Sequence, residues 1–329
     1  MGLQQKQDLE LIYSLHRNWQ PGQIKIKKLG GQTNRNFLIQ YQNEKRFVRI
    51  PWKSDVVDRK VEARNILALV KSKRLSQILP KYYLYYFRGK NILSKTKKKL
   101  LLPDGTMVAE YIDGKDINGR DLKKPKIQKA LLKTLHILHI SGVKFVNKYD
   151  VFRDEISKYK KKAKTYPVRK FISKKKIKKI EEIGGRVKRI FASGKALSTH
   201  NDLIFENLRL GKNGKVYLLD FEYAGFNIRD GLYYDLGIIL GGNLFQKNPI
   251  TIKIFEEILE KAKKIYKKDF DDYKLYCGAL TNVLVMFWWG IVKYFSSHTK
   301  AEKKYFKNYI LKRAKGIQYL YNLIDKKQR

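Results

Sequence analysis

The sequence of 329 residues has little cysteine, histidine, methionine or proline, with one, five, three and seven residues respectively. One cysteine, Cys277, excludes an intrachain disulfide, and no Cys or His residues have the spacing of a zinc site. The first thirty residues lack the charged start, apolar centre and cleavage site of a signal peptide. These absences fit a reducing compartment, and we predict a cytoplasmic protein.

Acidic residues are also scarce: 30 Asp and Glu stand against 72 Lys and Arg, which gives a formal net charge of +42. Such a balance attracts nucleic acid, anionic lipid surfaces or polyanionic substrates. The positive charges are spread along the chain and are not confined to one tail, which favours ordinary solvated faces. Weak association with an anionic surface is left open.

The most basic stretch is Lys158–Arg189, which contains fifteen Lys or Arg residues and only two acids, Glu181 and Glu182. Pro167 and the pair Gly184-Gly185 interrupt it. We predict two solvated helices here, with a role at an anionic surface as the alternative.

Long apolar runs are absent as well. The longest, GALTNVLVMFWWGIV (278–292), is shorter than the roughly 20 residues that a membrane-spanning helix needs, and it contains Thr281 and Asn282. We therefore predict no transmembrane segment and assign this run to a buried helix.

Hydrophobic residues make up 43% of the chain and tyrosines number 22, so the chain is globular and long enough for one large or two modest domains. Several short segments in the first part of the chain have the alternation or composition of strands: 23–29, 36–42, 46–51, 82–87 and 106–112. Helical spacing of apolar residues predicts one helix from Val57 to about Lys71.

After Gly114 the pattern becomes helical, beginning with a strongly periodic segment at 126–140. His136 and His139 lie on or beside its apolar face, which favours packed histidines over ligands. Asn213-Gly214 predicts a hairpin within 208–220, and helices are expected from Tyr233 onward. We predict an α+β protein of two lobes: a small antiparallel sheet with one helix at 1–109, and a larger, mostly helical lobe at 110–329.

One ordered set of polar residues carries the chemistry. His200, Asp202, Leu203 and Asn207 match the kinase catalytic-loop pattern H-x-D-L-x-x-x-N, and Asp220-Phe221 follows on the hairpin, where a metal-binding D-F pair belongs. Phosphoryl transfer needs an acceptor oxygen aimed at the γ-phosphate and metal ions that neutralise the phosphates. The alternative is that these are turn and capping residues.

The departures from protein kinases are informative. The metal motif is D-F-E, with Glu222 in place of glycine, and neither an A-P-E segment nor a G-x-G-x-x-G loop is present. The first hairpin instead carries GGQTN (30–34), and the strand FVRIP offers Arg49 where kinases have a phosphate-binding lysine.

Together, HND…N…DFEY, GGQTN, VRIP and FWWG resemble the choline and ethanolamine kinases, especially the bacterial choline kinases, within the aminoglycoside phosphotransferase-like superfamily. The resemblance covers residues 25–310 and implies a two-lobed protein kinase-like fold. It also implies a kinase that uses ATP and Mg²⁺ to phosphorylate the hydroxyl of choline, a step of phospholipid biosynthesis.

The resemblance assigns roles in the catalytic loop and the metal motif. Asp202 would be the catalytic base, and Asn207 and Asp220 the magnesium ligands. His200 and Asp235 would support the loop. Glu222 would support the metal or the substrate pocket.

For the nucleotide, the resemblance implies that Arg49 pairs with phosphates and is oriented by Glu62 on the following helix. The alternative for Glu62 is a surface position. Residues of the first hairpin would cover the phosphates, and the backbone between the lobes would hold adenine; these two groups are Gly30, Gly31, Thr33 and Asn34, and Glu110, Tyr111 and Ile112.

A choline ammonium cannot donate a hydrogen bond, so its site must rely on aromatic faces and a nearby carboxylate. Tyr223, Trp289 and Tyr305 are the candidates. Val292 stands where eukaryotic members have a second tryptophan, and Trp288 either compensates or belongs to the core.

Other readings stay open. The same fold could phosphorylate ethanolamine, thiamine, a sugar or an aminoglycoside, although a polycationic drug would prefer an acidic cleft. A different class of function is a nucleic-acid or lipid-surface binding protein with a vestigial kinase motif. The sequence does not indicate the oligomeric state.

Overall fold

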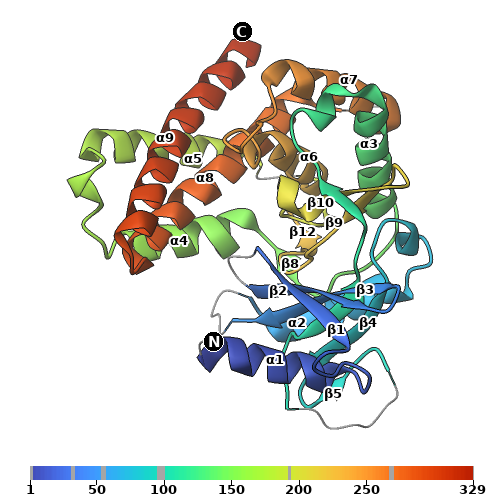
Figure 1. Ribbon diagram of the computed structural model, residues 1–329. Coiled ribbons are helices and arrows are strands. Elements are labelled where there is room, and N and C mark those ends of the chain that lie inside the picture. The colour runs from blue at the N-terminus through green and yellow to red at the C-terminus, as the bar shows by residue number, and fades with distance from the viewer. Residues whose placement is uncertain are drawn as a thin grey trace. The chain divides into compact units, whose positions relative to one another are not determined.

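The computed structural model describes residues 3–30, 34–52, 57–94, 101–191, 194–266 and 270–328. The chain forms two compact units (Figure 1). Unit 1 comprises Met1–Gly114 and Tyr217–Tyr223, and unit 2 comprises Lys115–Val216 and Ala224–Arg329. An antiparallel sheet dominates unit 1 and helices dominate unit 2, so the fold is the predicted α+β, protein kinase-like one.

The units divide the chain differently from the predicted lobes. The first division follows Gly114 and not residue 109, and Tyr217–Tyr223 groups with unit 1. Within unit 1, the backbone N–H of Leu218 donates a 2.9 Å hydrogen bond to the carbonyl of Ile78. Sequence order alone could not reveal this return, because the two partners are far apart along the chain.

The sheet of unit 1 has six strands in the order β1-β2-β3-β6-β4-β5, and all neighbours are antiparallel. All five predicted strands are present, and a short β5 follows β4. The bounds are β1 (Ile24–Leu29), β2 (Asn34–Tyr41), β3 (Glu44–Pro51), β4 (Tyr82–Phe87), β5 (Lys90–Asn91) and β6 (Met107–Glu110).

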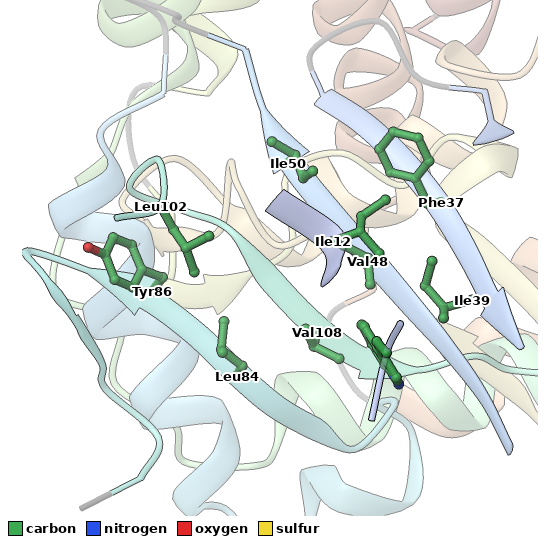
Figure 2. Close-up of a cluster of buried hydrophobic side chains, with 10 residues drawn as sticks. Ile12, Phe37, Ile39, Val48, Ile50, Leu84, Tyr86, Leu102 and Val108 are labelled. Carbon is green, nitrogen blue, oxygen red and sulfur yellow. The ribbon is translucent and has the colours of Figure 1, made fainter. Parts of the chain in front are cut away.

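One face of this sheet builds a hydrophobic core. Val48, Leu84 and Val108 lie in one row across β3, β6 and β4 and belong to this core. Helix α1 (Leu3–Leu15) adds Ile12 to the cluster (Figure 2). Helix α1 was not predicted, because its first turns, QQKQD, are polar and show no apolar periodicity.

Along a strand, neighbouring side chains point to opposite faces. Arg49, next to Val48, therefore lies on the other face, where Met107 and Tyr85 continue its row. Helix α2 (Arg59–Lys71) brings Glu62 to this face, and Asp58 caps its first turn. This helix was predicted at 57–71.

Unit 2 is mainly helical. Its helices are α3 (Pro125–His139), α4 (Lys158–Ala163), α5 (Lys174–Ile190), α6 (Gly231–Gly241), α7 (Ile252–Tyr266), α8 (Asp272–Ser296) and α9 (Lys300–Gln328). A short π-helix, η3, spans Phe152–Ser157, and the single-turn 3₁₀ helices of the chain are η1 (Leu75–Gln77), η2 (Asp121–Lys123), η4 (Val168–Lys170) and η5 (Phe205–Asn207).

Helix α8 forms the core of unit 2 and packs against α4, α5, α6 and α9. By length and composition alone it could cross a membrane, but 89% of its apolar window is buried inside the protein. The run 278–292 is therefore a buried core helix, as predicted.

Glycine lets α6 approach α8 closely. A Cβ on Gly237 would lie 2.5 Å from the backbone N of Ala279, and one on Gly278 would lie 2.2 Å from the carbonyl oxygen of Tyr233. Such distances require a bare backbone at both positions. This contact fixes α6, which carries Asp235.

The predicted interruption at Gly184-Gly185 is wrong, because α5 continues through both residues. A glycine inside a helix costs only about 1 kcal/mol. The buried residues Ile180, Ile183 and Val187 keep helical spacing across the pair, so their packing maintains the helix.

Short strands complete the fold. Strand β12 (Gly225–Asn227) lies between β8 (Lys148–Tyr149) and β9 (Leu197–Thr199). Strand β10 (Leu208–Gly211) lies between β7 (Gly114–Asp116) and β11 (Val216–Leu218), and a turn with Gly214 at φ 76° joins β10 to β11. The predicted hairpin is therefore present.

Candidate functional site

The predicted catalytic loop follows β9 and is held by Asp235 of α6. One carboxylate oxygen of Asp235 accepts a 3.0 Å hydrogen bond from the backbone N–H of His200, and the other accepts a 2.8 Å bond from that of Asn201. The Asp235 side chain is fully buried. Both ends of this carboxylate thus fix the backbone at the start of the loop.

Asn201 turns the chain with a left-handed conformation, φ 66°. Its Oδ1 accepts hydrogen bonds from Thr199 Oγ1 at 2.7 Å and from Asn227 Nδ2 at 3.0 Å. Asparagine tolerates this region better than most residues, and conformations of this kind concentrate at functional sites. The turn before Asp202 is therefore held by buried polar contacts.

Asp202 and Asn207 contact each other directly. The amide group of Asn207, at the end of η5, donates to the carbonyl oxygen of Asp202 and to its Oδ2, each at 2.9 Å. The backbone N–H of Asp202 donates to Nδ1 of His200 at 3.3 Å. Because the Asn207 nitrogen is used in this way, its Oδ1 is the atom left for a cation.

His139, predicted to be a packed histidine, is part of this network. Its Nε2 lies 3.1 Å from Oδ2 of Asp235 and its Nδ1 lies 2.9 Å from the hydroxyl of Tyr266. No local pattern could indicate this contact, because 96 residues separate His139 from Asp235.

In unit 1, Arg49 is the centre of a second polar cluster. Its guanidinium is 3% exposed and lies 2.5 Å from Oε1 of Glu62 and 3.3 Å from Oδ1 of Asp220. It also donates to the carbonyl oxygen of Gly105 at 3.1 Å. The predicted pairing of Arg49 with Glu62 therefore appears in the geometry of unit 1.

Glu62 is buried among three donors. Besides Arg49, the guanidinium of Arg59 and the hydroxyl of Tyr85 each lie 2.6 Å from its Oε2. Burial alone would raise the pKa of Glu62, but the two guanidinium groups outweigh it and lower that pKa. Burial likewise opposes the charge of Arg49, whereas Glu62 and Asp220 raise the pKa of Arg49.

Asp220 and Glu222 place two carboxylates beside this pair. Asp220 is left-handed, with φ 58°. Glu222 accepts a 3.3 Å hydrogen bond from Asn34 Nδ2 and lies 3.7 Å from Arg59. Burial, followed by the charge of Asp220, raises the pKa of Glu222 to about 7.

This donor set fits a magnesium ion in its chemistry. Mg²⁺ prefers carboxylate and amide oxygens, and a cation would relieve the repulsion between Asp220 and Glu222. Within the described residues, no group of three or more His, Cys, Asp or Glu side chains could hold a metal alone. Asn207 belongs to unit 2 and Asp220 to unit 1, so their joint role stays a prediction.

The residues predicted to cover the phosphates differ in their contacts. Gly30 has open space where a Cβ would stand, and its carbonyl accepts a 3.0 Å hydrogen bond from Asn36. The Asn34 side chain is buried and engaged, since its Oδ1 accepts a 3.0 Å bond from Arg59. Gly31 and Thr33 lie outside the described residues.

The segment predicted to hold adenine begins at Glu110, the last residue of β6. The backbone N–H of Glu110 donates to the carbonyl of Lys81 at 2.8 Å, and its carboxylate accepts the N–H of Lys81 at 3.1 Å. The N–H of Tyr111 lies 3.5 Å from the carbonyl of Lys45, and Ile112 is buried. A nucleotide role for these residues stays a prediction.

An aromatic cluster joins α8 to α9. The ring of Trp289 lies 5.7 Å from that of Phe306 and 5.6 Å from that of Tyr309, and Tyr305, 54% exposed, lies 6.1 Å from Tyr309. Burial mainly raises the pKa of Tyr309, and the charge of Asp202 contributes to the same rise. The charge of Arg313 lowers that pKa.

Arg313 covers part of this cluster and was missed by the sequence reading. Its guanidinium carbon lies 3.5 Å from the ring centre of Tyr309 and 4.9 Å from that of Phe245. Within the described part of the chain, its buried Nε has no hydrogen-bond partner. Burial lowers the pKa of Arg313.

A second aromatic group near Asp202 was also missed. The rings of Tyr149 and Tyr234 lie 6.1 Å apart, and the Tyr149 hydroxyl donates to Glu155 of η3. Burial raises the pKa of Tyr234, with smaller contributions from Glu155 and Asp202. A π-helix such as η3 often marks a functional site, but its sequence carries no periodic signal.

The other predicted acceptor residues differ in burial. Trp288 is 4% exposed and packs edge-on against Phe287 at 5.0 Å, so it belongs to the core. Trp289 is only partly buried. Tyr223 is also partly buried and belongs to unit 1.

The stability of the fold should depend on the proton of Glu155. Burial raises the pKa of Glu155 from 4.5 to about 7, although the Tyr149 hydrogen bond opposes this. The folded protein thus holds the proton more tightly than the unfolded chain, and stability falls as pH rises through this window. We expect Glu155→Gln to reduce the loss in unfolding free energy between pH 5 and pH 8 by about 1–3 kcal/mol.

Urea denaturation at the two pH values measures this effect. Glu182→Gln, at an exposed position of α5, is the control and should leave the pH dependence unchanged. Identical pH dependence in Glu155→Gln and the unaltered chain would contradict the expectation.

Comparisons with known proteins identify the family and the fold. The model of the choline/ethanolamine kinase family matches residues 26–266. The structure is similar to the choline kinase LicA from Streptococcus pneumoniae, with a TM-score of 0.69, 21% identity, and coverage of 96% of this chain and 100% of that one. No curated protein matches the sequence.

Two further solved structures share the fold. A choline kinase from Cryptosporidium parvum Iowa II has a TM-score of 0.68 and 17% identity, with coverage of 98% of this chain and 97% of that one. The ADP-bound aminoglycoside phosphotransferase APH(2'')-Ib has a TM-score of 0.60 and 17% identity, with coverage of 94% and 99%.

Proposed function

Because the chain belongs to the choline/ethanolamine kinase family and is an ATP-dependent small-molecule kinase, we propose that it transfers the γ-phosphate of ATP to the hydroxyl of choline. One observation carries this proposal: the buried Asp235 carboxylate fixes the backbone of the loop that holds Asp202, and the Asp202 carboxylate lies 2.9 Å from the amide group of Asn207. In this proposal the choline hydroxyl lies at Asp202, and the aromatic rings of α8 and α9 bind its ammonium group.

Asp202 is the proposed catalytic base. In phosphoryl transfer the carboxylate accepts the proton of the acceptor hydroxyl and aims its oxygen at the γ-phosphate. His200 and Asp235 are positioning residues in this proposal, because they act on the backbone of the loop. A fixed loop keeps the carboxylate aligned without a reorganisation cost.

Arg49 is the proposed phosphate ligand, and Glu62 orients it. Asp220 and Asn207 would hold Mg²⁺, and Glu222 would support Asp220. When bound, the ion neutralises charge on the phosphates. Nucleotide binding has a parallel in LicA, which has been crystallised with AMP.

The remaining nucleotide contacts are proposed from the same family pattern. The hairpin at 30–34 would cover the phosphates. The backbone of 110–112 would hold adenine. Both segments belong to unit 1, and we place the reaction in the cytoplasm.

The proposed acceptor residues are Trp289, Tyr305, Tyr309 and Tyr223. A quaternary ammonium over an aromatic face gains about 0.5–2 kcal/mol per ring. Glu155, hydrogen-bonded to Tyr149, places a carboxyl group beside the second aromatic group. The basic chain disfavours a polycationic aminoglycoside.

Ethanolamine is the second candidate acceptor. Arg313 covers one face of Tyr309, which reduces the aromatic surface that a quaternary ammonium can use. A primary ammonium can donate hydrogen bonds and depends less on that surface.

An acceptor screen tests the proposal. Purified protein with ATP and Mg²⁺ is assayed for ADP release with choline, ethanolamine and thiamine in parallel. We expect release to depend on choline most strongly. ADP release that no added alcohol stimulates would reject the proposal.

Trp289 should affect acceptor affinity more than turnover. We expect Trp289→Leu to raise the KM for choline about 2- to 30-fold, because one cation–π contact is lost, while kcat changes little. Steady-state kinetics with choline varied measure both constants. Trp288→Phe is the matched control: this core residue should change thermal stability and leave KM close to its original value. An unchanged KM in Trp289→Leu would remove Trp289 from the acceptor site.

A further inference from the structure

A groove between α5 and α9 in unit 2 lies outside the residues assigned to the reaction. Its volume is about 430 Å³, and Figure 1 shows α5 in yellow-green and α9 in red. The floor is apolar, because Ile180 and Ile183 of α5 face Ala314 and Ile317 of α9 along it, and all four are buried.

The rim of this groove is basic. Lys176 and Lys179 line it from α5 and Lys315 lines it from α9, and all three side chains are exposed. Among the residues that the structure describes, none of those lining the groove is acidic. Within the described residues, none of these three lysines forms an ion pair. Two nearby acids pair with other residues, Glu181 with Lys160 at 2.7 Å and Asp325 with Arg186 at 3.7 Å.

The groove is separate from the acceptor residues on the same helix. Tyr305 and Tyr309 precede the groove-lining residues of α9, and an α-helix rises about 1.5 Å per residue. Ala314, the first groove-lining residue of α9, therefore lies about 7.5 Å along the axis from Tyr309, and Ile317 lies about 12 Å from it. A ligand in the groove would not occupy the place proposed for choline.

The combination of an apolar floor and a cationic rim restricts the occupant. A free phosphate or a nucleic-acid backbone would satisfy the lysines but leave the isoleucine floor uncovered. A helix of a partner protein, about 10–12 Å in diameter, needs a wider groove, whereas about 430 Å³ is in the range of small-ligand pockets. An amphiphile with an anionic head and a hydrocarbon tail satisfies both surfaces.

We propose that this groove binds an anionic phospholipid at a membrane surface. The lipid phosphate lies at Lys176, Lys179 and Lys315, and the first carbons of an acyl chain lie on Ile180, Ile183 and Ile317. In this proposal, part of the large positive charge of the chain binds a lipid phosphate at a defined site. It does not depend on the acceptor.

Vesicle sedimentation at about 0.15 M salt, where diffuse electrostatics are screened, tests the proposal. The probes are vesicles of phosphatidylglycerol mixed with phosphatidylcholine, and vesicles of phosphatidylcholine alone. The groove variant reverses the three rim charges: Lys176→Glu, Lys179→Glu and Lys315→Glu. A matched control variant makes the same change in net charge at exposed lysines of α3 and α7: Lys129→Glu, Lys133→Glu and Lys253→Glu.

We expect the unaltered chain and the control variant to bind the anionic vesicles similarly, and the groove variant to bind at least about tenfold more weakly, because each lysine near a membrane surface contributes substantially. Phosphatidylcholine vesicles should bind little. Circular dichroism melting establishes that both variants are folded. Inorganic phosphate at millimolar concentration should not displace the vesicles.

Four results would overturn the proposal. An equal loss of vesicle binding in both variants would show that only net charge matters. Equal binding to phosphatidylcholine vesicles would show that an anionic head group is not required. Displacement of the vesicles by inorganic phosphate would show that binding does not require contact with an acyl chain. In the fourth result, the unaltered chain binds duplex DNA and no vesicles, and DNA binding is lost in the groove variant. That result would assign the groove to nucleic acid. Because none of these measurements uses ATP or choline, they stand or fall apart from the proposed kinase activity.

Discussion

Replacing Asp202 with alanine is expected to lower kcat for choline phosphorylation by at least about 100-fold, because a positioned general base contributes about 10²- to 10⁴-fold. The Asp202 carboxylate lies beside Asn207 at 2.9 Å, on a loop whose backbone is bound by the buried Asp235. Coupled ADP release at saturating ATP and choline measures the effect.

Asp202→Asn separates catalysis from structure. An asparagine at this position can still accept the hydrogen bond from Asn207, but it cannot take a proton. We expect it to be nearly as inactive as Asp202→Ala. Glu206→Gln, at an exposed position of the same loop, should keep kcat within a few-fold. Recovery of full activity in Asp202→Asn would show that Asp202 only supports the loop.

Replacing Glu62 with glutamine is expected to cost about 3–5 kcal/mol of unfolding free energy, the range for breaking a buried ion pair. Glu62 is the anion between Arg49 at 2.5 Å and Arg59 at 2.6 Å. Without its charge, two guanidinium groups stay in a buried place, with Asp220 and Glu222 as the remaining carboxylates. Urea denaturation measures the loss.

The pH dependence of this variant has a defined sign. The pKa of Glu62 is lowered from 4.5 in the folded chain, so its stabilisation is present above the unfolded pKa and is lost as pH falls through the folded one. The difference between the two proteins should therefore shrink in acid. A difference that is constant with pH would contradict the role of the Glu62 charge.

Glu44→Gln is the matched control for Glu62→Gln. Glu44 also pairs with an arginine, Arg46, at 2.6 Å, but its side chain is 60% exposed. Exposed ion pairs contribute about 0–1 kcal/mol, so this change should be small. Activity should follow the same order, because Glu62 orients Arg49 and Glu44 lies outside the polar cluster.

Local patterns determined much of the fold. Alternation in β1 and helical spacing in α2 and α3 follow from which face of an element is buried, and a sequence displays that directly. The composition of β4 and the apolar run of α8 also indicated these elements. Helix α1 was not predicted, because its first turns are polar. The glycine pair in α5 was misread because packing of Ile180, Ile183 and Val187 overrides local propensity.

Local sequence patterns indicated only some of the residues around Asp202. The motif spacing located Asp202, Asn207 and Asp220. Nothing in the motif indicated His139, Tyr309 or Arg313, because no local rule relates residues that come from different helices. Their contacts depend on how α3, α6, α8 and α9 pack.

The sequence by itself determined the elements with clear periodicity or composition, the kinase-like motif and the family, because periodicity and spacing are properties of neighbouring residues. Only the tertiary structure decided that Glu62 and Arg59 enclose a buried charge cluster with Arg49, that Trp289 packs with Phe306 and Tyr309, and that α5 and α9 enclose a basic groove. These are contacts between residues far apart in the chain, and their energies depend on burial, which is fixed when the elements pack.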